Sequence, residues 1–498
     1  MYNFNMKKLL ANGVVQLFNF RKFSQKQLCE EKIFGIEEFK KFSKEMIDYV
    51  ANYYENVEDR KVLPKIKPGY LKSLIPSKAP VEPDKWENIM DDIEKVIMPG
   101  VTHWRHPHFH AFYPTANSFP SVVADILVNA LSAPGFSWIS MPVSTELEMV
   151  MMDWIADLIG LPQYFKFSSN STGGGVIQSF ASDATYLTLI LARSIALSKK
   201  SNKEAQSKLV MYTSSQANYS VIKAALLAGV KLHYVDTDSL FRLDGTSLAK
   251  AIKKDKECGF VPFYLCANLG TTTSCAFDRI EELGPICNKE NIWLHVDAAY
   301  AGSSFVCEEN RHFMKGIELV DSFNFNLHKW MLVNMDCSAL WLKDKSKLSN
   351  AFNVEALYLH DSTSEKIPQY RHWQIPLARR FRSLKIWFTL RLYGQKGIQS
   401  YIRNHIELAR RFEELVRSDK RFEICYPVTM GLVCFRIKGS NELNEKLNMS
   451  INSEGSIFIT PSKLGDKYIL RFVVTYEHAN LDHINYAWDV IKKHAELL

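Results

Sequence analysis

Lys329 stands in the stretch N-F-N-L-H-K-W, where it follows an apolar strand and lies between His328 and Trp330. A lysine placed where water is scarce has a lowered pKa, and its neutral amine is a nucleophile toward a carbonyl carbon. The alternative is an ordinary lysine at the end of a strand, which this stretch taken alone favours. Two other motifs reverse that preference.

The first of these motifs is L-H-V-D-A-A-Y-A-G, which puts Asp297 at the end of an apolar run, before small residues that let a flat molecule approach. A buried carboxylate there needs a cationic partner, and a protonated pyridine nitrogen is one. The second motif, S-T-G-G-G-V-I-Q-S-F-A-S-D-A-T, contains a Gly-rich turn at 173–175 and then Ala181 and Ser182, at a turn into a helix. Free N–H groups and a hydroxyl at a helix start suit a phosphate.

A nucleophilic lysine, a carboxylate for a pyridine nitrogen and a phosphate site are together the requirements of pyridoxal 5′-phosphate. The sequence therefore predicts this cofactor. No metal is expected, because none of the nine cysteines forms a C-x-x-C pair. An odd number of cysteines in this pattern favours reduced thiols in a cytoplasmic protein over a disulfide framework or a zinc site.

The elements that position these groups alternate along the middle of the chain. Apolar runs of strand length are separated by helical patterns such as 219–227 and 280–289, and a long helical pattern follows the Gly-rich turn through Leu197. This alternation predicts an α/β fold with a mostly parallel sheet that helices cover on both faces. The predicted strands are 208–212, 230–235, 261–267, 292–296, 322–325 and 338–342.

The two ends of the chain have different patterns. A long helix over 384–416 and short strands near 422–426, 430–437 and 467–475 predict a smaller α+β domain. Residues 33–57 have apolar side chains at helical spacing, and a proline-marked stretch follows; this arm is expected to wrap another surface, possibly a second subunit. The predicted domains are an extension expected to be disordered (1–33), a helical arm that packs on the partner subunit (34–118), a large cofactor-binding domain (119–384) and a small C-terminal domain (385–498).

Composition excludes two classes of partner. The net charge of +7 is spread over 498 residues without a Lys/Arg block interleaved with aromatics, so nucleic-acid binding is not expected. The longest uncharged stretch, 126–145, contains prolines, a glycine and several serines, so no membrane span is expected. Residues 1–28 carry basic but no acidic side chains, and a disordered extension is favoured there over a mitochondrial-type presequence.

The motifs resemble those of the group II pyridoxal-phosphate decarboxylases, specifically the aromatic L-amino-acid decarboxylase family of animals, over about residues 34–495. The stretches that carry the resemblance include I-M-P-G-V-T-H-W, N-L-G-T-T-T, D-S-F-N-F-N-L-H-K-W and Y-R-H-W-Q-I-P-L-A-R-R-F-R-S-L-K. The resemblance implies fold type I of the pyridoxal-phosphate enzymes, which is aspartate aminotransferase-like. It also implies an obligate homodimer with the active site at the subunit interface.

The resemblance further implies a role for each matching residue. Lys329 holds the cofactor covalently with His328 beside it, Asp297 pairs with the pyridine nitrogen, and Tyr358, in a mobile loop, protonates the substrate carbon. The other matching residues are Ala181, Ser182 and Asn326 at the phosphate, Thr272 and Ala299 at the faces of the ring, and Trp104, Phe112, Tyr113, Thr115 and Phe136 of the partner subunit in the substrate pocket.

Asn218, in S-S-Q-A-N-Y-S-V, separates two activities within this resemblance. The decarboxylases have a His here that stacks on the pyridoxal ring, whereas the insect 3,4-dihydroxyphenylacetaldehyde synthases, also called aromatic acetaldehyde synthases, have Asn. An amide cannot exchange a proton near neutral pH, and an imidazole can. The resemblance therefore implies oxygen-dependent conversion of L-dopa to 3,4-dihydroxyphenylacetaldehyde, CO₂, NH₃ and H₂O₂.

Three alternatives stay open at this point. The chain could be an ordinary aromatic L-amino-acid decarboxylase that makes dopamine or a related amine, with Asn218 a neutral change. Histidine decarboxylase activity is a neighbouring possibility, because the predicted pocket aromatics suit a ring of any kind. An inactive member with a binding or structural role is disfavoured, because Lys329, Asp297, His328 and Tyr358 are all retained.

Overall fold

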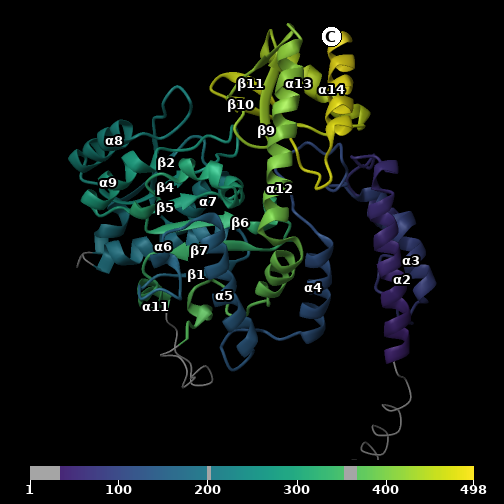
Figure 1. The fold of residues 1–498 in the computed structure, drawn as a ribbon, viewed down its shortest axis with the longest axis horizontal. Helices are drawn as coiled ribbons and strands as arrows, with labels where there is room; N and C mark the ends of the chain where they lie inside the picture. Colours follow the sequence, from purple (N-terminus) through teal and green to yellow (C-terminus); the bar gives the residue numbers. More distant parts are fainter. Residues whose placement is uncertain (1–33, 199–202, 353–366) are drawn as a thin grey trace, which may run out of the picture. The chain divides into compact units, whose positions relative to one another are not determined.

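The structure is a computed structural model that describes residues 34–198, 203–352 and 367–498 (Figure 1). The described chain forms two compact units. One unit comprises the described residues up to Arg60 together with Pro64–Val101, and the other comprises Lys61–Leu63 and Thr102–Leu498.

The first unit is helical. Its main elements are α2 (Ile36–Glu55), where the sequence predicts a helix over 33–57, and α3 (Trp86–Asp92). Phe42 of α2 stacks on Trp86 of α3 with the ring centroids 4.4 Å apart. No residue of α2 is buried, although its apolar side chains recur at helical spacing.

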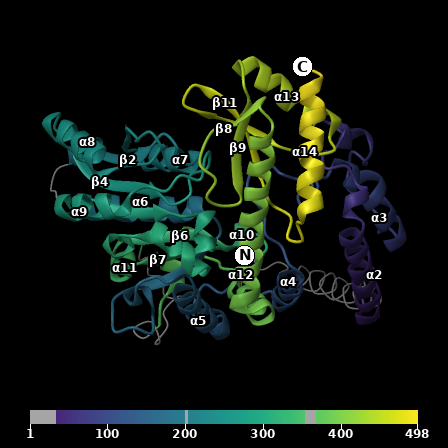
Figure 2. The same ribbon diagram turned by 45° about the horizontal axis from the view of Figure 1, so that its top comes forward.

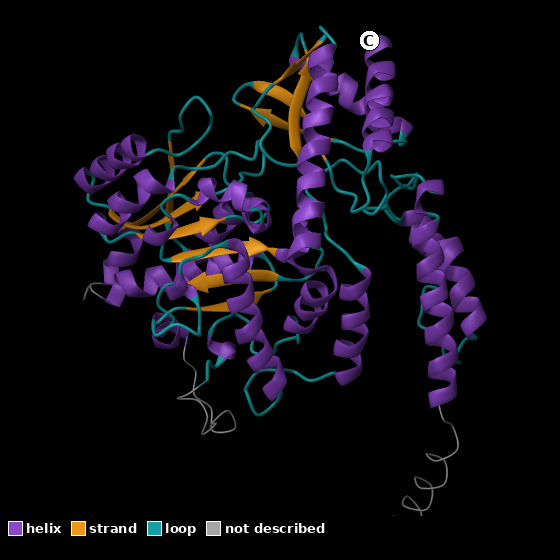
Figure 3. Cartoon of the chain, viewed as in Figure 1, coloured by secondary structure: helices purple, strands orange, loops and turns teal. Residues whose placement is uncertain are grey.

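The second unit contains, among its described residues, a seven-stranded sheet with the order β1-β7-β6-β5-β4-β2-β3 (Figure 3). All neighbouring strands pair in parallel except at β7, which is antiparallel to both β1 and β6. The mostly parallel sheet predicted from the sequence is confirmed. The strands are β1 (Gly174–Gln178), β2 (Leu209–Ser214), β3 (Lys231–Val235), β4 (Val261–Asn268), β5 (Trp293–Asp297), β6 (Ser322–Asn326) and β7 (Ser338–Leu342).

Helices cover both faces of this sheet (Figures 1 and 2). Side chains of β2 alternate between two cores, because successive residues of a strand point to opposite faces. Val210 and Tyr212 pack with α5, α8 and α9, whereas Leu209 and Met211 pack with α6 and α7. The helices of this part are α4 (Phe119–Leu131), α5 (Pro142–Ile159), α6 (Ala181–Ser198), α7 (Tyr219–Ala228), α8 (Gly245–Glu257), α9 (Ile280–Glu290), α10 (Leu327–Trp330) and α11 (Ser346–Phe352).

The Gly-rich stretch is a correction to the sequence prediction. The glycines lie in and before strand β1 rather than in a turn that opens a helix, and α6 begins only at Ala181. A side chain at Gly175 would lie 2.5 Å from the methyl carbon of Met152 and 2.8 Å from the indole nitrogen of Trp341. Glycine is therefore required here by close packing, a use of glycine within strands that local sequence does not distinguish from a turn.

The C-terminal part carries a second sheet, which is four-stranded within the described chain and has the order β10-β11-β9-β8. The predicted smaller α+β fold is confirmed. The helix predicted over 384–416 is present, but a kink divides it at Gly394, whose backbone is not helical (φ 62°, ψ 175°). Strand β10 and helix α13 were not predicted; β10 contains Pro461 and alternates buried and exposed residues, as an edge strand does. The elements are α12 (Ser383–Ser418), β8 (Phe422–Ile424), β9 (Leu432–Ile437), α13 (Asn441–Glu454), β10 (Thr460–Leu464), β11 (Lys467–Val473) and α14 (Leu481–Glu496).

Candidate active site

The predicted cofactor residues lie at or after the carboxyl ends of strands that run in the same direction, and these ends meet at one edge of the sheet. The register of the central strands places Asn268, Asp297 and Asn324 side by side. The structure therefore brings the following groups to one edge: Ala181 and Ser182 after β1, Asn218 after β2, Thr272 after β4, Asp297 and Ala299 at and after the end of β5, and Asn326, His328 and Lys329 at and after the end of β6.

Lys329 and Asp297 form an electrostatically coupled pair at this edge. Asp297 is 5% exposed, and its Oδ1 accepts the N–H of Ala299 at 2.9 Å. Burial raises the pKa of Asp297, while the positive charge of Lys329 and the Ala299 N–H oppose that shift. Burial lowers the pKa of Lys329; Asp297 opposes this effect and Arg471 adds to it. The lowered pKa favours the neutral amine that attacks a carbonyl carbon.

An aromatic stack supports Lys329. The Nζ of Lys329 lies 5.5 Å from the ring centroid of Tyr113, one of the predicted pocket residues. Tyr113 stacks on Tyr300 at 4.0 Å, and Tyr300 stacks on Trp330, the residue after the lysine, at 4.7 Å. The Tyr113 hydroxyl donates to the carbonyl of Thr271 at 3.0 Å, which fixes the ring beside the amine.

Asn218 caps helix α7 and contacts Thr272. Its Oδ1 accepts the backbone N–H of Ser220 at 2.9 Å, and its Nδ2 donates to Oγ1 of Thr272 at 3.1 Å. Asn is one of the residue types preferred at this position of a helix, because its side chain satisfies a free N–H of the first turn. Both ends of the amide are therefore held, and neither end carries a proton that can be transferred near neutral pH.

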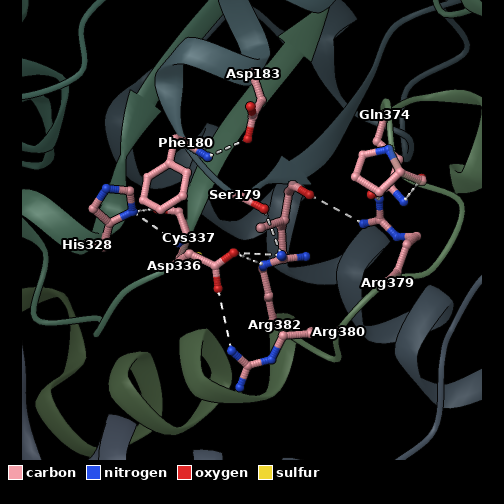
Figure 4. Close-up of polar contacts among 12 residues, drawn as sticks. Ser179, Phe180, Asp183, His328, Asp336, Cys337, Gln374, Arg379, Arg380 and Arg382 are labelled. Atoms are coloured by element: carbon pink, nitrogen blue, oxygen red, sulfur yellow. Dashed lines mark hydrogen bonds and ion pairs between the residues drawn. The ribbon is translucent and has the colours of Figure 1, made fainter.

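His328 is buried beside the start of α6. Its Nδ1 lies 2.7 Å from the carbonyl oxygen and 2.9 Å from the amide nitrogen of Cys337, and its ring meets Phe180 edge-on at 5.5 Å (Figure 4). Burial, together with the charge of Lys329, lowers the pKa of His328 to about 4. The imidazole is therefore neutral at pH 7.

The start of α6 and Asn326 provide a test of whether the residues fit pyridoxal phosphate. The first N–H groups of a helix have no acceptor within it, and Ser182 is exposed in the first turn of α6. The buried Oδ1 of Asn326 has no hydrogen-bond partner within the described chain. An amide side chain also carries two N–H donors, so Asn326 has the chemistry to bind a phosphate oxygen. With Asp297 for the pyridine nitrogen and Lys329 for the carbonyl, the residues fit the cofactor.

The predicted substrate residues are only partly brought together. Trp104 and Phe112 stack at 5.2 Å with both rings exposed, and Thr115 lines a small pocket together with Trp104. Phe136 lies in the segment between α4 and α5, and its place in the pocket of a partner subunit stays a prediction. Tyr358 lies outside the described residues.

A network of buried ion pairs that the sequence did not predict surrounds the end of β1 (Figure 4). A guanidinium nitrogen of Arg379 lies 2.5 and 2.7 Å from the two carboxylate oxygens of Glu148, and both side chains are 2% exposed. Glu148 also accepts the N–H of Ile177 in β1 at 2.8 Å. Nearby, Arg382 binds Asp336 at 2.6 Å and the hydroxyl of Ser179 at 2.8 Å, just before α6.

Removal of Arg379 is expected to destabilise the protein strongly, because it leaves the Glu148 carboxylate buried and unpaired. We expect Arg379→Met to lower the free energy of unfolding by about 3–5 kcal/mol. The matched control is Arg403→Met, which breaks the exposed pair with Glu309 and is expected to change the free energy of unfolding far less. Urea unfolding of both variants measures the difference. Equal losses would contradict the role of the buried pair.

Neither a metal-binding cluster nor a helix able to cross a membrane is found among the described residues. Within residues 34–198, 203–352 and 367–498, no group of three or more His, Cys, Asp or Glu side chains is placed to hold a metal ion. Among the helices that the structure describes, none has the length and apolar character needed to cross a membrane.

The fold, the lysine–aspartate pair and the helix start define a pyridoxal phosphate enzyme. A family model described as the pyridoxal-dependent decarboxylase conserved domain matches residues 68–438, and the chain belongs to this family.

Similar proteins agree with this assignment. The aromatic-L-amino-acid decarboxylases of Manduca sexta and Drosophila melanogaster are each 52% identical, and for the Manduca protein the match covers 91% of both chains. The structure of Oryza sativa TDC with PLP and tryptamine has a TM-score of 0.91 at 33% identity, covering 94% of this chain and 99% of that one. Rhodiola rosea 4-hydroxyphenylacetaldehyde synthase has a TM-score of 0.88 at 36% identity, covering 94% and 100%.

Proposed function

We propose that this enzyme converts L-dopa to 3,4-dihydroxyphenylacetaldehyde, CO₂, NH₃ and H₂O₂, with consumption of O₂ and water. Decarboxylation is the reaction after which its family is named. The observation that carries the oxidative half of the proposal is Asn218, which is held by Ser220 and Thr272 at the cofactor edge and has no transferable proton.

When bound, pyridoxal phosphate supplies an electron sink for the negative charge that loss of CO₂ leaves on the substrate's α-carbon. The residues of the chain decide what happens at that carbon. Lys329 provides the amine that binds the cofactor, and the negative charge of Asp297 keeps a proton on the pyridine nitrogen. Formation of the amine requires delivery of a proton to the α-carbon. Help from a well-placed general acid is worth roughly 10²- to 10⁴-fold in rate.

Tyr358, to which the resemblance assigns this proton transfer, acts without the help of an imidazole, because Asn218 has no transferable proton. Protonation of the α-carbon is therefore slow. The α-carbon therefore stays available to O₂, which takes up two electrons and two protons to become H₂O₂. Water then replaces the nitrogen, so that the Cα–N bond breaks, a C=O bond forms and NH₃ leaves. One L-dopa, one O₂ and one water give one each of aldehyde, CO₂, NH₃ and H₂O₂, so atoms and electrons balance.

A second candidate function is ordinary aromatic L-amino-acid decarboxylation to dopamine. The names of the Manduca and Drosophila relatives favour it, since both are called aromatic-L-amino-acid decarboxylases. The Rhodiola protein, named an aldehyde synthase, has the same fold. Because proteins with both names share this architecture, the fold does not choose between the two products. Which of the two products forms depends on the side chain at position 218.

Product analysis distinguishes the two candidates. Purified enzyme incubated with L-dopa in air is expected to yield the aldehyde as its main product, separated from dopamine by chromatography. Anaerobic incubation is expected to suppress the aldehyde. Dopamine as the sole product in air would refute the aldehyde proposal and support the second candidate. Borohydride reduction that fixes the cofactor on Lys329 checks the covalent link independently of the product.

We also propose that the chain acts as a homodimer in the cytoplasm. Helix α4 exposes an apolar face that includes Phe119, Val123 and Leu127, and α5 exposes Val150 and Trp154. Such a large exposed apolar surface is typical of an interface. Sedimentation analysis is expected to give twice the mass of one chain.

The described cysteines are free thiols, which supports the proposed location in a reducing compartment.

A further inference from the structure

Arg471 lies on β11 of the small sheet and is 5% exposed. Its guanidinium reaches two segments that are distant in sequence and the neighbouring strand β10. Nε donates to the carbonyl of Thr273 at 3.1 Å, one terminal nitrogen donates to the carbonyl of Phe112 at 3.1 Å, and the other lies 3.4 Å from the hydroxyl of Thr460. The guanidinium carbon lies 5.0 Å from the ring centroid of Tyr113.

Phe112 depends on these contacts, because its backbone is in the left-handed region with φ of 56°. A non-glycine residue held in this region costs about 1–3 kcal/mol and persists only where the surroundings fix it. The N–H of Phe112 donates to Thr460 at 3.3 Å, and its carbonyl accepts from Arg471. The fixed backbone places the Phe112 ring against Trp104, at the predicted substrate pocket.

The second segment that Arg471 holds carries Thr272, the residue that accepts a hydrogen bond from Asn218. Thr273 follows directly, and its carbonyl is fixed by Arg471. Arg471 thus contacts the backbone of two segments that carry predicted site residues, at Phe112 and at Thr273. Lys329 and Arg471 also both lie near the Tyr113 ring.

We propose that Arg471 is a positioning residue of the decarboxylation reaction, which ties the Trp104–Phe112 aromatic pair and the Thr272–Asn218 pair to the small-domain sheet. The inference rests on the reaction shared by the family and on the geometry of the site. It holds whether the product is the aldehyde or the amine.

The positioning role of Arg471 can also be tested through the pKa of Lys329, which depends on the charged groups around it. Burial lowers the pKa of Lys329, Asp297 opposes that effect, and Arg471 lowers the pKa further. Four further titratable groups near Lys329, all in the described part of the chain, are neutral at pH 7. His328 has its pKa lowered to about 4, burial raises the pKa of Tyr113, and Cys275 and Cys434 both have pKa values raised to about 12. Loss of the Arg471 charge is therefore expected to raise the pKa of Lys329.

Two substitutions separate the hydrogen bonds of Arg471 from its charge. Arg471→Lys keeps the charge but loses the fork that reaches Phe112 and Thr273, so kcat/KM is expected to fall about tenfold or more, mainly through KM. Arg471→Met loses both, and the pKa of Lys329 is expected to rise as well. The matched control is Arg436→Lys, which changes a buried arginine of the same sheet that donates to Gly439.

The pKa of Lys329 is measured on the full-length, cofactor-free chain from the pH dependence of its acetylation by acetic anhydride, followed by mass spectrometry. Steady-state kinetics of the holoenzyme give kcat and KM. The proposal predicts a higher KM in Arg471→Lys with an unchanged Lys329 pKa, a shifted pKa in Arg471→Met, and neither change in Arg436→Lys. A wild-type KM in Arg471→Lys overturns it. If Arg471→Met does not fold, the KM of Arg471→Lys decides alone.

Discussion

The Asp297→Asn enzyme is expected to decarboxylate L-dopa about 10²- to 10⁴-fold more slowly than the wild type. The carboxylate of Asp297 is buried and acts on Lys329 across the site. Removing one charge of a buried pair costs about 3–5 kcal/mol. The charge on the pyridine nitrogen is most important in the transition state. A transition state destabilised by this free energy corresponds to a rate about 10²- to 10⁴-fold lower. The initial rate of CO₂ release measures it, with kcat expected to fall more than KM rises.

The matched control for this prediction is Asp278→Asn. Asp278 is also a buried carboxylate close to the end of β4, and it accepts the N–H groups of Leu243 and Asn268 at 2.8 and 2.7 Å. Burial raises its pKa to about 7, so the carboxyl is partly protonated at neutral pH. The control is expected to lose stability but to keep kcat within about threefold of the wild type. Equal losses of kcat in both variants would contradict a specific role for Asp297.

The Asn218→His enzyme is expected to release mainly dopamine. An imidazole at this position supplies or relays a proton to the α-carbon, an effect worth roughly 10²- to 10⁴-fold. The ratio of aldehyde to amine is therefore expected to fall at least about tenfold. His is a poorer helix cap than Asn, so a loss of about 1 kcal/mol in stability is also expected. Chromatography of the products and thermal unfolding measure the two effects separately.

Asn218→Gln is the control for the change at Asn218. It keeps an amide without a transferable proton but shifts the group that caps α7 and contacts Thr272. We expect it to lose some activity and stability while the aldehyde remains its main product. An aldehyde-to-amine ratio that stays unchanged in Asn218→His would show that the amide does not control the outcome.

The sequence predicted those parts of the site that depend on local pattern. Lys329 and Asp297 follow apolar runs that form β6 and β5, and strand–helix alternation predicts that the ends of such strands meet. The Gly-rich stretch was assigned to a turn, because local sequence does not show that Met152 and Trp341 leave no room for a side chain at Gly175.

The parts that were missed depend on contacts between segments far apart in the chain. Arg471 stands in an ordinary apolar strand, and only the folded chain shows that it reaches Phe112 and Thr273. The Glu148–Arg379 pair joins α5 to the segment before α12 in the same way. No residue adjacent in sequence to Arg471, Glu148 or Arg379 predicts the contacts that these side chains make.

The ratio of O₂ consumed to CO₂ released shows in one experiment whether decarboxylation is coupled to oxidation. It is measured in a sealed, air-equilibrated vessel with L-dopa and catalase-free enzyme, using an oxygen electrode and a CO₂ probe. The wild type is expected to give a ratio near one, and Asn218→His is expected to give a ratio well below one. If the wild type releases CO₂ at full rate with no O₂ uptake, the amide at Asn218 does not direct the reaction to the aldehyde.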